Sequence, residues 1–429
     1  MNTNEQLLHY VWMFRLFPSA SLKTVDGQDV EVIDPGMHNR DAGPDFFNAK
    51  IKIGDKVWAG NVEIHCSSDE WVKHGHPHDK AYNSVILHLA ENVNALVMNQ
   101  RGQQIPQCVL TVPDDIRANA DYLLFSLNRI PCKQFLNILP ISMLYSWLNA
   151  LSVERLERKT NEIYAHLERF NHSWDETFYL LLTRNFGFGL NTEEFQSLAL
   201  SLPFNYILRH SDNLLQIEAL MFGQAGMLNE EGLRDTYYCS LKKEYTFLKA
   251  KYGLKCREDL FFKSMRIRPR SFPQLRIAQL ASLLQRSGRL FSHILEEEEI
   301  GELRSLFHTA PSEYWETHYS FGSTSPKMDK QPGEASLDIL LINTVVPMLF
   351  AYGRKTNSEK CCDRAIRLME ALKPERNSIV REFAQAGVIP RHAFDTQALI
   401  QLRKEYCDPR KCLYCRIGHK LLTSAHGNK

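Results

Sequence analysis

The sequence lacks an uninterrupted run of about eighteen apolar residues, the length that a membrane-spanning helix requires. It also lacks a basic segment ahead of the apolar stretch from Leu7 to Phe17, since Glu5 precedes that stretch and His9 and Arg15 interrupt it. We therefore expect a helix there, and neither a signal peptide nor a membrane span. Net charge is small as well, because 51 basic and 50 acidic residues leave a formal charge of +1. Whole-chain charge thus neither favours nor excludes nucleic acid as a partner.

The composition is that of an ordinary folded protein, with 44% hydrophobic and 24% charged residues among 429. A chain of this length accommodates two or three domains, each with its own core. The ten cysteines occur without a secretory signal, which predicts a reducing compartment where thiols are buried or bind metal. The cytoplasm is therefore the expected location.

Short β-branched runs alternate with turn residues in the first third of the chain. Asp26-Gly27 and Gly54-Asp55 each separate two such runs, which is typical of β-hairpins. A capped short helix is expected at residues 67–72. Further strands are expected at residues 85–89, 95–98 and 108–112. The predicted order is therefore a helix, three strands, a helix and a strand.

The pattern changes near residue 125. From about residue 141 onward, apolar residues recur three and four positions apart, which predicts helices without a strong strand. Breaks between these helices are expected at residues 185–189, 268–273 and 322–333. The fold class predicted is thus an α/β domain with a mixed sheet over residues 1–125, followed by a large all-α domain over residues 126–429.

Two carboxylates are expected to meet at neighbouring strand ends. With Gly54-Asp55 as the turn, the strand after Pro44-Asp45 runs antiparallel to the strand that carries Glu63-Ile64-His65. Side chains alternate along a strand, so Glu63 and His65 face the same side. Carboxylates are preferred ligands of Mg²⁺ and Mn²⁺, and such an ion activates water for phosphodiester cleavage. We predict a divalent cation held by Asp45 and Glu63, and a catalytic group formed by Asp45, Glu63 and His65.

This arrangement resembles the core of the PD-(D/E)XK nuclease superfamily, which has a restriction-endonuclease-like sheet. A longer string resembles an uncharacterised bacterial family, a domain of unknown function of about this length; it comprises Gly43-Pro44-Asp45-Phe46, residues 60–65, Trp71, His76, Asp79, Tyr82 and residues 85–88. The superfamily resemblance covers about residues 1–115 and implies metal-dependent cleavage of DNA or RNA. Nucleases of this kind carry lysine where this chain has His65. The competing interpretation is a degenerate core that binds nucleic acid or serves assembly.

A histidine cluster follows directly, as His74-x-His76-x-His78-Asp79, with His88 on the next expected strand. Its spacing of two suits a loop or strand, and mixed histidine and carboxylate ligands suit Zn²⁺ or Mn²⁺. We expect His76, Asp79 or His88 to supplement the metal site. The alternatives are histidines that only cap and solvate a loop, and a metal-dependent hydrolase of another substrate built around them.

Three cysteines and a histidine lie near the C-terminal end, as Cys407-x4-Cys412-x2-Cys415 and His419. The cysteine spacing matches a plant-type iron–sulfur ligand run, which needs a distant fourth cysteine. Cys132, or Cys361 and Cys362, can supply it. Alternatively His419 completes a Cys₃His zinc site. The sequence leaves zinc, an iron–sulfur cluster and buried thiols open.

A basic loop before an expected helix contains four arginines, Arg266, Arg268, Arg270 and Arg276. Such a loop can bind phosphates of DNA or RNA through its charge and through the helix N-terminus. The alternative is an exposed interhelical loop that pairs with acidic residues such as those at 296–299.

Overall fold

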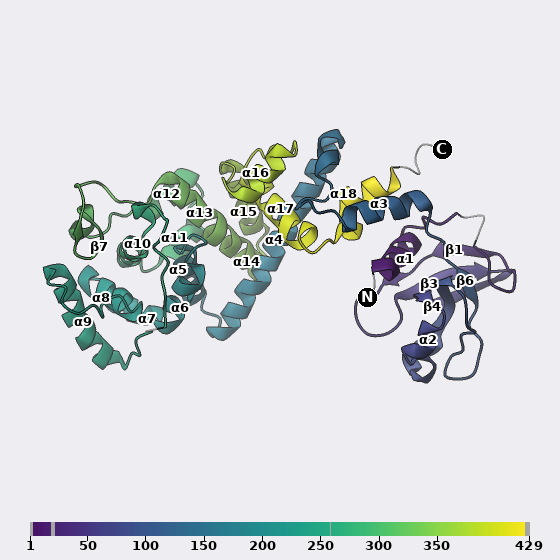
Figure 1. Ribbon diagram of the computed structural model, residues 1–429. Coiled ribbons are helices and arrows are strands. Elements are labelled where there is room, and N and C mark those ends of the chain that lie inside the picture. Colours follow the sequence, from purple (N-terminus) through teal and green to yellow (C-terminus); the bar gives the residue numbers. More distant parts are fainter. Residues whose placement is uncertain (1–2, 19–21, 258, 425–429) are drawn as a thin grey trace. The chain divides into compact units, whose positions relative to one another are not determined.

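The computed structural model describes residues 3–18, 22–257 and 259–424 and divides the chain into two compact units (Figure 1). Unit 1 comprises Met1–Leu139 together with Leu402–Lys429, and unit 2 comprises Pro140–Gln401. The predicted division at residue 125, with 126–429 as one domain, therefore needs correction. Periodicity locates helices but does not say where they pack, and here α18 (Arg416–Thr423) lies against α3 (Asp114–Leu124).

A six-stranded mixed sheet forms the centre of unit 1. Its strands are β1 (Val30–Asp34), β2 (Met37–His38), β3 (Phe46–Ile53), β4 (Lys56–Ser67), β5 (Val85–Asn92) and β6 (Gln107–Val109). Strands β1, β3 and β4 form an antiparallel meander, β5 lies parallel to β4, and β6 lies parallel to β5. The short β2 pairs with β3. A mixed sheet at this end of the chain confirms the coarse fold class predicted from the sequence.

The strand predicted at residues 95–98 contributes only an isolated bridge between Met98 and Gln104. Two of its backbone N–H groups bond to side chains instead. Ala95 N donates to Ser68 Oγ at 2.8 Å, and Val97 N donates to Gln107 Oε1 at 3.3 Å. Side-chain acceptors compete with ladder formation, and no residue pattern within 95–98 reveals that competition.

Helix α1 (Thr3–Met13) packs on the sheet against β4, and its Leu7, Leu8 and Trp12 are buried. Short helical segments form the crossover between β4 and β5, namely α2 (Glu70–Lys73), η2 (His76–His78) and η3 (Lys80–Ser84). Trp71 of α2 is fully buried in a small hydrophobic cluster that is separate from the large core of unit 2. A crossover of this kind is what a parallel neighbour of β4 requires.

Two backbone features set the positions of the functional side chains. Strand β3 carries an irregularity between Phe46 and Ala49, where Asn48 has φ +57°, directly after the carboxylate at Asp45. Strand β4 approaches β5 closely at Gly60, because a Cβ there would lie 2.4 Å from Ile86 Cγ2. This close approach holds β5 beside β4, in a register that pairs Glu63 with His88.

Unit 2 is helical, with one short β-hairpin. Its α-helices are α4 (Ile141–Arg169), α5 (Trp174–Asn185), α6 (Thr192–Ser201), α7 (Phe204–Leu208), α8 (Leu214–Gln224), α9 (Thr236–Tyr252), α10 (Pro273–Arg286), α11 (Leu290–Glu296), α12 (Ile300–Phe307), α13 (Glu334–Leu340), α14 (Val346–Thr356), α15 (Glu359–Ala371), α16 (Ser378–Gln385) and α17 (Ala393–Gln401). The hairpin β7 (His318–Ser320) and β8 (Ser323–Thr324) is too short to leave a strand pattern. Helix α4 packs against α14 and α17 in one large apolar core.

One helix among the described residues is long and apolar enough to cross a membrane by length and composition. It runs over Glu334–Thr356, through α13, a π-helical turn at Leu341–Val345 and α14. Within its apolar window, 67% is buried inside the fold. Such burial is typical of a core helix, which explains why an apolar stretch of this length belongs to unit 2.

Candidate metal centre

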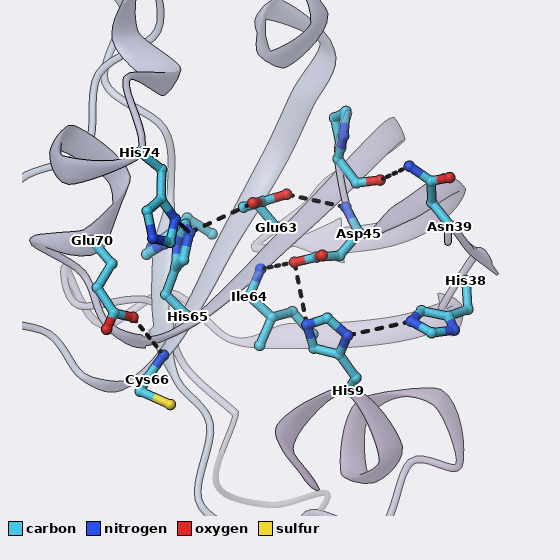
Figure 2. A network of polar contacts seen from close by, with 12 residues as sticks. His9, His38, Asn39, Asp45, Glu63, Ile64, His65, Cys66, Glu70 and His74 are labelled. Atoms are coloured by element: carbon cyan, nitrogen blue, oxygen red, sulfur yellow. Dashed lines mark hydrogen bonds and ion pairs between the residues drawn. The ribbon is translucent and has the colours of Figure 1, made fainter. Parts of the chain in front are cut away.

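The two carboxylates predicted to meet lie side by side in unit 1 (Figure 2). Asp45 N donates to Glu63 Oε2 at 3.0 Å, and Ile64 N donates to Asp45 Oδ2 at 2.9 Å. The β3–β4 hairpin produces this pairing, since Asp45 directly precedes β3 and Glu63 lies in the buried part of β4. Each carboxylate is thus tied to the backbone that carries the other.

Two histidines approach the second oxygen of Glu63. His76 Nε2 lies 3.3 Å from Glu63 Oε1, and His65 Nε2 lies 3.6 Å from the same oxygen. His74 Nδ1 lies 3.2 Å from His65 Nε2, and one ligand nitrogen from each of the three histidines falls within 4.8 Å of the others. We call His65, His74 and His76 the histidine cluster. It combines a residue of β4 with residues of the crossover to β5.

These spacings can be compared with the geometry of a metal site. Nitrogen and oxygen ligands about 2.0–2.2 Å from a tetrahedral ion lie about 3.3–3.6 Å from one another. The separations of Glu63 Oε1 from His76 and His65 are 3.3 and 3.6 Å. In addition, His76 Nε2 is buried and makes no hydrogen bond, although it lies 3.3 Å from Glu63 Oε1. A metal ion would give this nitrogen a partner, so the residues present fit a divalent ion of the Zn²⁺ or Mn²⁺ class.

Burial controls the protonation of this group. Glu63 is 4% exposed, and its burial together with the nearby charge of Asp45 raises its pKa. Burial and neighbouring histidines lower the pKa of His65 to about 3 and that of His76 to about 4. Both imidazoles are therefore neutral at neutral pH, which is the form that binds metal. A bound cation would in turn favour the ionised form of Glu63.

His88 lies behind the histidine cluster. Its Nε2 is 2.9 Å from His65 Nδ1, and the residue is fully buried on β5. Burial lowers its pKa to about 3. This contact orients the His65 ring and leaves the other ring nitrogen of His65, Nε2, facing Glu63. His88 therefore lies in the neighbourhood predicted from the sequence, in contact with His65 rather than with a carboxylate.

A second pair of histidines flanks Asp45 and was missed by the sequence-based prediction. His9 Nε2 of α1 lies 3.3 Å from Asp45 Oδ2, and His38 Nε2 of β2 lies 3.3 Å from His9 Nδ1. In Figure 2, His9 and His38 lie on the Asp45 side, while His65 and His74 lie on the Glu63 side. His9 interrupts the apolar stretch of α1, which was the only sequence signal that pointed to it.

Asp79 was predicted as a possible metal ligand, but in the structure its side chain has another role. Its Oδ1 accepts a hydrogen bond from Ala81 N at 2.8 Å and caps η3. The side chain is exposed, and among the described residues Asp79 is not a member of the histidine cluster. The sequence could not separate Asp79 from His76 because both stand in the same short crossover.

The predicted cysteine ligands Cys407, Cys412 and Cys415 come together in unit 1, and Cys132 joins them along one cavity. His419 points elsewhere, since its Nδ1 lies 2.8 Å from the hydroxyl of Tyr10. Cys361 and Cys362 belong to α15 in unit 2. Of the fourth ligands considered from the sequence, the structure therefore brings only Cys132 to the three C-terminal cysteines among the described residues.

The four arginines predicted to contact nucleic acid divide into two groups. Arg266, Arg268 and Arg270 are exposed in the segment between α9 and α10. Arg276 is 8% exposed; its guanidinium donates to Gln279 Oε1 at 3.0 Å and lies 4.1 Å from the centre of the Phe188 ring. Arg276 is thus a packing residue of unit 2, because it falls one turn inside α10 on the buried face.

Comparison with known proteins shows a family match. Residues 5–378 match the family described as "Protein of unknown function (DUF2851)". No curated protein and no solved structure matches the chain. The chemistry of the site therefore has to be argued from its own residues.

Proposed function

The chain belongs to the DUF2851 family, whose description assigns no function, and from the site itself we propose metal-dependent hydrolysis of phosphodiester bonds in DNA or RNA. The single observation that carries the proposal is the grouping at Glu63, whose Oε1 lies 3.3 and 3.6 Å from two neutral, buried imidazole nitrogens. Such a group holds a divalent ion, and a bound ion polarises a phosphate and lowers the pKa of a water molecule. We assign Glu63, His65 and His76 as ligands, with His74 as a fourth.

The choice of phosphodiesters rests on the order of the elements. A helix, a three-stranded meander, a helical crossover and a parallel strand follow one another, with Asp45 directly before β3 and Glu63 in β4. This order, together with the placement of the two carboxylates, supports a PD-(D/E)XK-like core. In such a core the acids lie at the scissile phosphate, which is where the proposal puts Asp45 and Glu63.

In the proposed site the protein's own residues have distinct tasks. Asp45 is held by Ile64 N and contacts His9 Nε2 at 3.3 Å, so it can accept a proton from an attacking water molecule. His9 and His38 continue from Asp45 toward a less buried position and provide a path for that proton. His65 takes the place of the lysine of the superfamily, and it serves here as a metal ligand that His88 orients.

A second candidate function follows from the presence of His65 where nucleases of the superfamily carry lysine. Histidine ligands suit Zn²⁺, which also serves hydrolases of substrates other than nucleic acids. The observation that favours this candidate is the histidine cluster, which gives the site more nitrogen than oxygen ligands. The two candidates share the metal and differ in the substrate.

Activity measurements with the full chain test both candidates. Labelled single- and double-stranded DNA and RNA are incubated with Mn²⁺, Zn²⁺ or Mg²⁺, using wild-type protein, Glu63→Gln and the matched control Glu70→Gln. Glu70 Oε2 accepts backbone hydrogen bonds from Cys66 and Ser67 outside the ligand group. We expect cleavage that Glu63→Gln abolishes and Glu70→Gln retains.

Other outcomes of this assay decide between the alternatives. Metal binding without cleavage of any nucleic acid would exclude the nuclease proposal and favour the second candidate, to be followed with small phosphate and carboxylate esters. Binding of nucleic acid without cleavage would favour a degenerate core. Absence of any metal binding would exclude both hydrolase functions.

A further inference from the structure

Four cysteines of unit 1 line a cavity whose walls include none of the residues assigned to the metal centre. Cys132 comes from the N-terminal part of the unit, and Cys407, Cys412 and Cys415 come from the segment that follows unit 2. All four are buried, with exposed fractions of 6–9%. The other lining residues are mostly apolar: Leu123, Pro131, Leu402 and Ile417. We call this space the thiol cavity.

The four thiols are close enough to affect one another. Burial raises the pKa of Cys407, and the neighbouring thiols Cys132, Cys415 and Cys412 raise it further. None of the four takes part in a disulfide. Cysteine side chains are the ligands of zinc and of iron–sulfur clusters in proteins, and both commonly take four of them. The gathering of four cysteines around one space therefore indicates a thiolate-bound metal group.

The space lined by the four cysteines is about the size of one water molecule. Its volume is about 20 Å³, and a single water molecule needs roughly 10–15 Å³. The backbone beside the cavity is tightly packed, because a Cβ at Gly418 would lie 2.0 Å from Cys412 O. Cores normally fill gaps of this size with side-chain atoms. A largely apolar wall that includes four cysteines instead leaves a dry space beside thiols that can bind an inorganic group.

The identity of the fourth ligand bears on the choice of metal. A local Cys₃His zinc site would use His419, but His419 Nδ1 lies 2.8 Å from the Tyr10 hydroxyl, and His419 does not line the cavity. Cys132 lines it instead, so the fourth ligand is a thiol, as in an iron–sulfur cluster.

We propose that Cys132, Cys407, Cys412 and Cys415 bind an iron–sulfur cluster. The C-x4-C-x2-C run with one remote cysteine is a known ligand pattern for such clusters. The cluster joins the two chain segments of unit 1 that lie before and after unit 2. It holds α18, whose His419 contacts Tyr10 of α1, onto the N-terminal part of the unit.

The test starts from the wild-type full chain, expressed and purified without oxygen. Iron, zinc and acid-labile sulfide are measured per chain, and visible absorption is recorded before and after reduction. We expect iron and sulfide in equal amounts, about two or four of each per chain, with negligible zinc. Zinc without sulfide, or absence of both metals, would overturn the proposal without reference to any variant. Neither result would affect the hydrolase proposal, which depends on Glu63 and the histidine cluster.

Variants then assign the ligands. Cys132→Ala is expected to reduce iron content by at least about tenfold relative to wild type, whereas the exposed Cys239→Ala should leave it unchanged. His419→Ala should also retain the cluster, because His419 contacts Tyr10. The opposite pattern, with iron lost in His419→Ala and kept in Cys132→Ala, would disprove the assignment. Circular dichroism of the helical signal shows whether each variant is folded.

Discussion

Replacement of Glu63 by glutamine tests the metal centre because it removes one charge and nearly preserves the shape of the side chain. The amide oxygen of glutamine can still accept the hydrogen bond that Asp45 N donates to Oε2 at 3.0 Å. The replacement removes the anionic oxygen that lies 3.3 Å from His76 Nε2 and 3.6 Å from His65 Nε2. Glu63→Gln therefore separates metal binding from folding.

The expected size of the effect follows from the position of Glu63. Removing a residue that only orients a metal ligand lowers metal affinity about 10–100-fold. Loss of a charged ligand should exceed this, so we expect at least about 100-fold weaker binding of Zn²⁺ or Mn²⁺, which is about 2.7 kcal/mol. The metal-free protein should not lose stability at pH 7. Burial and the charge of Asp45 raise the pKa of Glu63, which makes its ionised form unfavourable in the fold.

Two measurements give these quantities. Competition with a coloured chelator reports metal affinity, and urea unfolding in excess chelator reports stability. Glu70→Gln is the matched control, since Glu70 binds the backbone of Cys66 and Ser67. A change in affinity of less than about threefold for Glu63→Gln, or an equal loss in Glu70→Gln, would refute the assignment of Glu63 as a ligand.

Three further predictions concern other positions. His88→Ala removes the contact at 2.9 Å that orients His65 and should weaken metal binding about 10–100-fold in a chelator competition, whereas unchanged affinity would contradict its orienting role. Gly60→Ala would place a Cβ 2.4 Å from Ile86 Cγ2 and 2.7 Å from Ser84 O, so urea unfolding should show a loss of about 1–3 kcal/mol. Burial raises the pKa of Glu218 to about 7 from an unfolded value of 4.5. Stability from this group is therefore present below pH 4.5 and lost by about pH 7, by up to about 3 kcal/mol, and Glu218→Gln should abolish that part of the pH dependence in urea unfolding.

Sequence reasoning predicted the features that depend on local geometry. Gly54-Asp55 forms the expected turn, and the alternation along β4 places Glu63 and His65 as expected. The hairpin brings Asp45 near Glu63, whereas the register shift between Phe46 and Ala49, which sets the final pairing, is not visible in the turn or in the period of two. These relations hold within about twenty residues of chain.

Features that depend on tertiary packing were not predictable from the pattern. His9 reaches Asp45 only because α1 packs across β4, and no spacing rule connects residues on a helix and a later strand. The position of Cys132 beside Cys407 was one of several choices, since nothing local distinguishes it from Cys361. The boundary of unit 1 was missed for the same reason: the last helices resemble those of unit 2 in sequence, although they pack with α3.

The composition of unit 1 from both ends of the chain has a consequence for biosynthesis. Between Cys132 and Cys407 the ribosome must add about 275 residues, which at roughly 5–20 residues per second takes roughly 14–55 s. Throughout this interval the nascent sheet exists without α18, and Cys132 is without its three partner cysteines. Unit 2 can complete its core first, because all of its residues precede Leu402. Unit 1 is therefore completed only late in synthesis. A chain that stops shortly after Gln401 would contain all of unit 2 but only part of unit 1.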